Sequence, residues 1–409
     1  MKKILALLLA VCTMCITLAS CSSVSPLTIK ADEMITPNGK EIDEKFKESI
    51  YNFSFDLTKK MVGEGTNLFF SPYSIYSALA IAANGAANNT RKQFCDMFGL
   101  TIEELNEYLY TYNLKLQDNK EGKLSIANSV WVNEENLNVN EDYLKQVISY
   151  HSADVYREDF SKSDITSKIN NWCSKKTNGM IKKIVDDIPN YYVMCLLNAI
   201  YFDMKWEDEF KTTLKDEFTN YSGTKSTIDF MKSKEKGAYV GDDFVGFKKS
   251  YKGGKYSFMA ILPSENVDII DFVNSLDYKK YTEILNSYCY YSVNTLVPKM
   301  DFEYSTDLKP ILSEIGIDES FDDSKADFSL LGEALIKGNI CIDKVVHKAK
   351  LTLDEKGTKA AAVTFVGFGA KSAAPPEEEI DVFLNRPFVM LIVDNATNIP
   401  LFTGVVTNM

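Results

Sequence analysis

The stretch that decides the fold is LTLDEKGTKAAAVTFVGFGAKSAAPP, residues 351–376. It opens at an acidic corner, turns at Gly357, and then continues as small and β-compatible residues with no proline before Pro375. Long loops in compact domains are usually functional or disordered, and a proline-free run of this kind can pair as a strand. We therefore expect an exposed loop that is able to become a strand.

The rest of the chain can build a large core. Of its 409 residues, 45% are hydrophobic and 12% aromatic, and no linker, repeat or low-complexity tract interrupts residues 41–409. We expect these residues to form one domain, although length alone would allow two or three. The formal net charge is −12, and near −14 (−12 − 2) if a leader carrying Lys2 and Lys3 is removed. This acidic balance argues against nucleic-acid binding.

The N-terminus has the pattern of a lipoprotein signal peptide, residues 1–20. Two lysines precede an apolar run, 4–18, that is short for a membrane span, and small residues then precede Cys21. We expect Cys21 to be lipidated and the polar residues 21–40 to form a flexible tether. The alternative is an ordinary secretory signal with a chance cysteine. The protein is then expected outside the cytoplasm, secreted or anchored to a bacterial membrane by its lipid.

Patterns of enzyme and metal chemistry are lacking in the sequence. The chain has two histidines, His151 and His347, and no HExxH, P-loop or GxGxxG pattern. The cysteines beyond the leader are widely spaced and form no CxxC pair, so neither a zinc site nor a disulfide framework is expected. They are Cys95, Cys173, Cys195, Cys289 and Cys341. We expect no cofactor and no metal.

Hydrophobic periodicity predicts helices mostly in the first half and strands mostly in the second. The expected helices are 43–61, 72–83, 101–118, 164–185, 269–276 and 308–316. The expected strands are 124–132, 193–202, 247–251, 256–262, 291–297, 344–353, 388–393 and 401–406. This order is typical of an α+β fold rather than a doubly wound α/β fold.

Seven motifs, taken together and in this order, resemble the serpin family over residues 41–409. They are NLFFSPYSIYSALA, LLNAIYFDMKWEDEF, LVPKMDFE, DLKPILSEIGIDESFDDSKADFS, VVHKAKLTLDEKGTKAAA, NRPFVMLIV and IPLFTGVV. The resemblance implies three β-sheets, about eight or nine helices, and an exposed reactive-centre loop at about 355–376. It also implies an inhibitor rather than an enzyme: a protease attacks the loop, becomes acylated, and is trapped when the loop inserts into the large sheet.

The resemblance assigns a hinge to the start of the loop. Its residues are Glu355, Gly357, Thr358, Ala360, Ala361 and Ala362. Since side chains alternate between the faces of a strand, Thr358, Ala360 and Ala362 would share one face and are small enough to be buried. Lys359 stands where serpins usually have glutamate, but it falls on the outward face. We therefore expect insertion to tolerate it.

The scissile bond follows by counting from the hinge glycine, as in inhibitory serpins. Fourteen residues beyond Gly357 lies Lys371, followed by Ser372, and a basic residue there suits a trypsin-like protease with a carboxylate in its pocket. A shift of one residue would make the bond Ala370–Lys371 and would suit an elastase- or subtilisin-like protease. Both alternatives stay open.

Further residues match two family sites. The shutter, a polar cluster beneath the sheet opening, matches Ser71, Ser74, Asn198 and His347. The breach, where the loop first enters, matches Trp206, Lys299 and Glu355. From the residues alone, ordinary structural roles are favoured: Ser71 as a helix cap, Trp206 as a core residue, and Lys299 and Glu355 as surface charges.

Two functions are therefore weighed. The first is a monomeric, irreversible inhibitor of serine proteases, with action on cysteine proteases left open. The second is a non-inhibitory binding protein with the serpin fold. The alanines at 360–362 favour the first, because bulky or charged residues there would hinder insertion.

Overall fold

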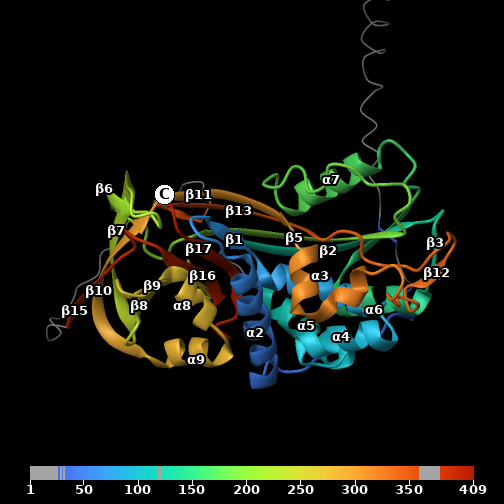
Figure 1. The fold of residues 1–409 in the computed structure, drawn as a ribbon, viewed down its shortest axis with the longest axis horizontal. Coiled ribbons are helices and arrows are strands. Elements are labelled where there is room, and N and C mark those ends of the chain that lie inside the picture. Colours follow the sequence, from blue (N-terminus) through green and yellow to red (C-terminus); the bar gives the residue numbers. More distant parts are fainter. Residues whose placement is uncertain (1–25, 28–29, 31–32, 118–121, 359–377) are drawn as a thin grey trace, which may run out of the picture.

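The computed structural model describes residues 26–27, 30, 33–117, 122–358 and 378–409. This part of the chain contains nine α-helices and three β-sheets, which confirms the expected α+β serpin architecture. Figure 1 shows a long sheet across the middle of the molecule, with α7 on one face and α3 and α5 on the other. A second sheet curls around α8 and α9 at one end.

The helices follow from sequence signals at their ends. Ser71 caps α3 by accepting from the Ser74 amide, Pro72 occupies its first turn, and all but one of its residues are buried. Asp43 caps α2 in the same way, through the Phe46 amide. The helices are α2 (Glu44–Met61), α3 (Pro72–Ala83), α4 (Asn88–Phe98), α5 (Ile102–Gln117), α6 (Glu141–His151), α7 (Ile165–Lys176), α8 (Ile269–Ser275), α9 (Tyr278–Asn286) and α10 (Lys309–Leu312).

A six-stranded sheet carries the functional region. Its order is β11 (Met300–Asp307), β13 (Val346–Asp354), β14 (Gly357–Thr358), β5 (Met194–Lys205), β2 (Lys123–Asn133) and β4 (Asp154–Glu158). The two-residue strand β14 is antiparallel to both of its neighbours, β13 and β5. These two neighbours therefore run parallel to each other on either side of it.

The second sheet, which curls around α8 and α9, has nine strands. Its order is β1 (Leu68–Phe70), β17 (Pro400–Val406), β16 (Phe388–Asp394), β9 (Tyr256–Pro263), β8 (Phe244–Ser250), β7 (Lys225–Val240), β10 (Tyr288–Pro298) and β15 (Glu379–Phe383), with β6 (Thr212–Thr219) also on β7. β16 and β17 are buried along their whole lengths, as expected for central strands. A third, two-stranded sheet pairs β12 (Gly332–Ala334) with β3 (Leu137–Val139).

Two hydrophobic clusters stabilise the fold. The larger one fills the space between the sheets and helices α2 to α6. The smaller one lies between α7 and the six-stranded sheet and includes Trp131, Tyr156, Ile169 and Trp172. α7 therefore has its own contacts with one face of that sheet, separate from the main core.

The expected helix 164–185 is wrong in its second half, because α7 ends at Lys176. Asn178 and Gly179 adopt positive φ angles of 50° and 78°, a conformation that terminates a helix. The Thr177 hydroxyl accepts from the Ile181 amide, so a local turn replaces the helical pattern. The helix expected over 308–316 is also shorter, since a π-helical turn follows α10 at Ser313–Ile317.

The residues just before α2 lie against the domain. The Gly39 amide donates to Glu107 Oε2 over 2.6 Å, and the Leu27 amide donates to the Val155 carbonyl over 2.7 Å. That residues 21–40 form a flexible tether stays a prediction, because part of that segment lies outside the described residues. Within the described ranges, no helix is long and apolar enough to cross a membrane. No group of acidic, cysteine and histidine side chains there is arranged to hold a metal ion.

Candidate functional site

The hinge turns back into the sheet immediately after β13. Asp354 accepts from the amides of Lys356 (2.8 Å) and Gly357 (3.2 Å), which closes a tight reversal. Gly357 then pairs with Lys205 of β5, and Thr358 pairs with Met204 of β5. On the other side both residues pair with β13. Two hinge residues, Gly357 and Thr358, thus already form a strand in the six-stranded sheet.

Gly357 meets its neighbouring strand too closely for a side chain. A Cβ atom at this position would lie 2.7 Å from Lys205 Cα and closer still to the Met204 carbonyl oxygen. Real Cβ contacts do not reach such distances, so a larger residue would push β14 away from β5. The glycine is therefore required for entry at this point.

Thr358 points into the protein, as the alternation of faces predicts. Its side chain is only 3% exposed, and its Oγ1 lies 2.7 Å from the hydroxyl of Tyr251. Tyr251 follows β8 and was not identified from the sequence. The only sequence signal was an aromatic residue before the Gly253–Gly254 turn, which is far too common to mark a functional contact.

The breach residues converge around the same reversal. The Trp206 ring is buried, and its Nε1 donates to the Asp354 carbonyl over 2.9 Å. Lys299 Nζ lies 2.5 Å from Glu355 Oε1, and this hydrogen bond lowers the pKa of Glu355 below its usual value. Trp206 is a core residue that also holds the hinge, while Lys299 and Glu355 form a partly exposed ion pair beside it.

Phe210 is a further residue that the sequence did not indicate. Its amide donates to the Glu355 carbonyl over 2.9 Å, and the Trp206 amide donates to the Lys356 carbonyl over the same distance. The backbone of the reversal is therefore held from the segment that follows β5. Backbone contacts of this kind leave no residue-specific signature in a sequence.

The shutter residues also meet in space. The Ser71 amide donates to His347 Nε2 over 3.1 Å, while the Ser71 hydroxyl donates to the Leu401 carbonyl over 2.6 Å. The Ser74 hydroxyl donates to Asn198 Oδ1 in β5, and Asn198 in turn donates to Asn128 in β2 over 2.7 Å. Ser71 is thus both the helix cap and a member of the cluster.

His347 is neutral in this arrangement. Its Nε2 accepts a hydrogen bond, and a protonated imidazole has no acceptor. Burial lowers the pKa of His347 to about 4. Its contacts are those of a structural histidine that joins β13 to the cap of α3.

Below the hinge, β5 and β13 lie on either side of β14's continuation line in the sheet, and we call the space between these two strands the lane. Within the described strands, β5 and β13 share no backbone pairing with each other, and β14 is what connects them. The lower half of β5, from Met194 to Asn198, is only half-buried. The lane is wide enough at its upper end to hold one strand, because β14 occupies it there.

The segment after the loop is fixed in the other sheet. β15 runs parallel to β10, with Glu379 opposite Ser292, and the Ser292 amide donates to the Glu378 carbonyl over 2.9 Å. Thr358 and Glu378 therefore belong to two different sheets. The intact loop connects them, so its C-terminal part cannot follow the hinge while both attachments remain.

Several predicted residues lie outside the described part of the chain. They are Cys21, Ala360, Ala361, Ala362, Lys371 and Ser372, together with the alternative Ala370. Their assignments as lipidation site, hinge and scissile bond stay predictions.

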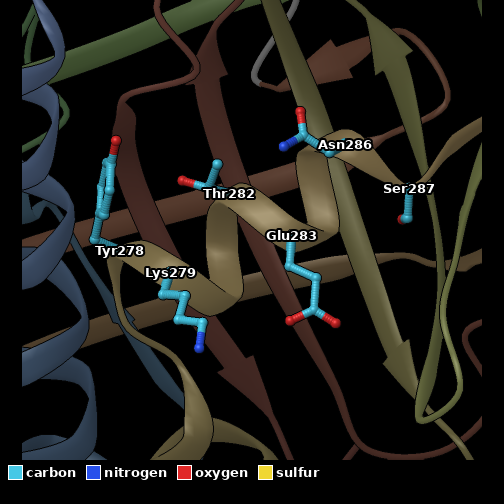
Figure 2. Close-up of a pocket in the computed structure, with 6 residues that line it drawn as sticks. All are labelled: Tyr278, Lys279, Thr282, Glu283, Asn286 and Ser287. Atoms are coloured by element: carbon cyan, nitrogen blue, oxygen red, sulfur yellow. The ribbon is translucent and has the colours of Figure 1, made fainter.

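Two surface hollows are separate from this region. Figure 2 shows the first, lined by residues of α9 and the turn after it, among them Tyr278, Glu283 and Ser287. The second is a cleft of about 820 Å³ between residues 38–40 and helices α4, α5 and α6. Neither hollow includes a hinge, breach or shutter residue.

Comparison with known proteins agrees with this geometry. The profile of a family described as "Serpin (serine protease inhibitor)" matches residues 48–409. An uncharacterized serpin-like protein of Methanosarcina acetivorans is 31% identical over 375 residues, which cover 86% of this chain and 85% of the relative. The alpha-1-antiproteinase of Ovis aries is 29% identical and covers 89% of this chain and 88% of its own.

A solved structure is similar over almost the whole chain. The crystal structure of the thermophilic serpin tengpin in the native state has a TM-score of 0.86 and 38% sequence identity, and covers 94% of this chain and 100% of tengpin. Inhibition of proteases is the general function of the family, and no enzymatic activity is implied. The chain belongs to the serpin family.

Proposed function

We propose that this protein is an irreversible, suicide-substrate inhibitor of serine proteases. The observation that carries the proposal is the position of Thr358, which is buried and paired between β13 and β5. A loop that merely displays a binding epitope has no need of an entry strand. A loop that must insert needs flanking strands that are not paired with each other and a small, β-compatible first residue, and the described strands β5 and β13 together with Thr358 support this proposal.

The chemistry proposed for the loop is that of an interrupted proteolysis. The protease serine Oγ attacks the carbonyl carbon of Lys371 and gives up its proton to the protease histidine. The Lys371–Ser372 amide bond breaks, the histidine protonates the leaving Ser372 amine, and an ester joins Lys371 to the protease. Ser372 then departs with the segment that leads to β15. The attachment to the second sheet is thereby released.

Insertion would continue the register that β14 has begun. Thr358 faces Met204, so Lys371, thirteen residues later (371 − 358), would face Tyr191 (204 − 13) just beyond the start of β5. At about 3.3 Å per residue, the acylated end would travel roughly 40 Å along the sheet. Each step would supply backbone partners to both strands that flank the lane. The ester would thus be carried to the far end of the sheet before water hydrolyses it.

The test is incubation with trypsin, a pancreatic elastase and a subtilisin, followed by denaturing electrophoresis and mass spectrometry. We expect a heat-resistant covalent complex and cleavage after Lys371 with the trypsin-like enzyme. Cleavage after Ala370 would instead establish the elastase- or subtilisin-like alternative. If no protease in the panel, including cysteine proteases such as papain, forms a covalent complex, the inhibitory function is refuted.

The same samples distinguish the binding-protein alternative. Insertion after cleavage should raise the melting temperature strongly, because a central strand is added to the sheet. A cleaved chain with an unchanged melting temperature, together with the lack of covalent complexes, would indicate a non-inhibitory binding protein.

The proposed location is the outer surface of a bacterial membrane, with Cys21 lipidated and the domain acting as a monomer. The support is the sequence pattern around Cys21, since the described residues begin after it. Expression with a radiolabelled fatty acid tests the anchor, and we expect label in the wild type but not in Cys21→Ala. Equal labelling of both, or of neither, would contradict lipidation at Cys21. Light scattering of the purified domain tests the monomeric state.

A further inference from the structure

We propose that Tyr251 is a positioning residue that docks the hinge in the lane before any protease arrives. The inference rests on the proposed trapping function and adds a residue to it. The observation behind it is the 2.7 Å contact between the Tyr251 hydroxyl and Thr358 Oγ1, in which both side chains are buried. Thr358 is also paired on both sides, with β13 and with β5.

The Tyr251 ring is held firmly. It stacks on Trp206 at a centroid distance of 4.5 Å and an interplanar angle of 12°, and Phe202 meets it edge-on at 4.8 Å. The Tyr251 amide also donates to the Tyr256 carbonyl over 3.0 Å. Burial raises the pKa of Tyr251 far above the physiological range, so the phenol keeps its proton. Its hydroxyl is therefore a fixed partner in one place.

The contact joins the two large sheets. Thr358 lies in the six-stranded sheet, whereas Tyr251 directly follows β8 of the nine-stranded sheet. An isolated bridge between Trp206 and Tyr251 connects the same two regions through the backbone. The Thr358 side chain is thus in hydrogen-bond contact with Tyr251, a residue that need not move when the loop inserts.

Withdrawal of the hinge would leave a buried hydroxyl without this partner. An unsatisfied buried hydroxyl is costly, whereas removal of both partners together costs much less. The contact therefore favours the docked hinge in the intact protein. The inserted loop would keep Thr358 at the same place, so the contact is not broken when insertion proceeds.

Docking matters because the acylated protease has two competing fates, trapping by insertion and release by hydrolysis. After acylation, insertion competes with hydrolysis of the ester, and the ratio of the two rates sets how many inhibitor molecules are consumed for each protease trapped. Forming the first paired residues of a new strand is the costly step, since chain entropy is lost before many contacts are gained. A hinge that is already docked has completed that step.

The experiment uses Tyr251→Phe, Thr358→Val and the double variant in the full domain. Tyr256→Phe is the matched control, because it also removes a buried tyrosine hydroxyl, one that donates to the Leu116 carbonyl over 3.0 Å rather than to the hinge. Two readouts are taken: hydrogen exchange of the amides at Gly357 and Thr358, and the stoichiometry of inhibition. Near-ultraviolet circular dichroism verifies that each variant is folded.

We expect each single variant to speed exchange at the hinge amides by about fivefold or more and to raise the stoichiometry of inhibition to roughly twice that of the wild type or above. The double variant should return toward wild type, since neither hydroxyl is then left alone. Tyr256→Phe should change neither readout. A Tyr251→Phe protein that matches Tyr256→Phe in hinge exchange, or a double variant with strictly additive effects, overturns the proposal.

A failure of the proposed function would look different. If the wild type forms no covalent complex with any protease, the trapping function fails. Hinge exchange still decides whether Tyr251 docks Thr358, because that measurement needs no protease.

Discussion

The two ends of the lane between β5 and β13 are built in opposite ways. The upper end is filled by backbone: β14 pairs on both sides, and Thr358 is buried against Tyr251. The lower part is spanned by side chains, with Ser71 of the α3 cap bonded to His347 in β13 and Ser74 bonded to Asn198 in β5. The upper end thus already contains a third strand, whereas in the lower part side-chain hydrogen bonds connect the two flanking strands to the start of α3.

Under the proposed function, this difference would set the direction of insertion. A strand that grows from the upper end meets a prepared path, whereas one that started below would first have to displace a hydrogen-bonded cluster. Side-chain hydroxyls and amides can change partners more easily than a β-ladder can. The predicted shutter residues form hydrogen bonds in the present arrangement, and under the proposed function they would exchange these partners when a strand inserts.

The largest effect is expected from Thr358→Arg, which should disrupt the pairing of β14 at the upper end of the lane. A guanidinium cannot be buried where Thr358 lies without an ionic partner, so the hinge should leave the lane. We expect trapping to be lost completely and the protein to become an ordinary substrate of the same protease. Electrophoresis after incubation with the protease measures this, with Thr358→Ser as the control that keeps the hydroxyl. An arginine variant that still inhibits fully would show that insertion does not begin here.

Gly357→Val tests the same end through the backbone. Its side chain would overlap the Met204 carbonyl and Lys205, so β14 should detach from β5. We expect covalent complex to fall about tenfold or more and the amide of Thr358 to exchange rapidly. The matched control is Gly63→Val, because an added Cβ there meets no atom within 4 Å and the backbone lies outside the left-handed region. Normal trapping by the valine variant would contradict the close approach of β14 and β5.

Acid should affect the lower part of the lane. The pKa of His347 is about 4 in the fold against an ordinary value of 6.5, so the unfolded chain binds a proton that the folded chain does not. Stability is therefore full above pH 6.5 and falls as the pH drops toward 4, by roughly 3 kcal/mol for this residue. Urea midpoints across that range measure the loss.

The comparison variant for this acid effect is His347→Gln, which should flatten the pH dependence. His151 contributes in the same direction, since burial lowers its pKa to about 3, and it remains in the variant. A His347→Gln protein whose midpoint changes with pH as steeply as the wild type would refute the assignment.

The smallest effect is expected from Glu355→Gln at the breach. The pair with Lys299 is about one-third exposed on both sides, so solvent screens it and its contribution should stay below about 1 kcal/mol. Because the pKa of Glu355 is lowered, the contribution is present at neutral pH and is lost as the pH falls below 4.5. The urea midpoint at pH 7 measures this contribution. A stability change of several kcal/mol would contradict the assignment of this pair as a solvent-screened ion pair.

Elements with a local sequence signal, such as a helix cap or a proline, could be predicted from the sequence. The cap and proline of α3 fixed its position, and the lower-lane residues Ser71, Ser74, Asn198 and His347 were found through ordered motifs. The prediction of a helix over 164–185 was too long, because the hydrophobic periodicity continued past Asn178 and Gly179, whose backbone conformation ends α7.

The upper end of the lane was the less predictable one. The sequence indicated that the loop could become a strand, but not that Gly357 and Thr358 are already paired in the intact chain. Tyr251 and Phe210 act through one hydroxyl and one backbone amide, which depend on how distant segments meet. Such contacts follow from tertiary structure and leave no periodic or compositional signal.

The lane has a consequence for how the protein behaves in concentrated solution. Among the described strands, β5 and β13 are interior strands that do not pair with each other, so they resemble two exposed sheet edges. Such edges accept extended segments from other chains. Warming should therefore let copies associate through strand exchange, at a rate that rises with protein concentration. Prior cleavage of the loop should suppress this association, because each molecule would then fill its own lane.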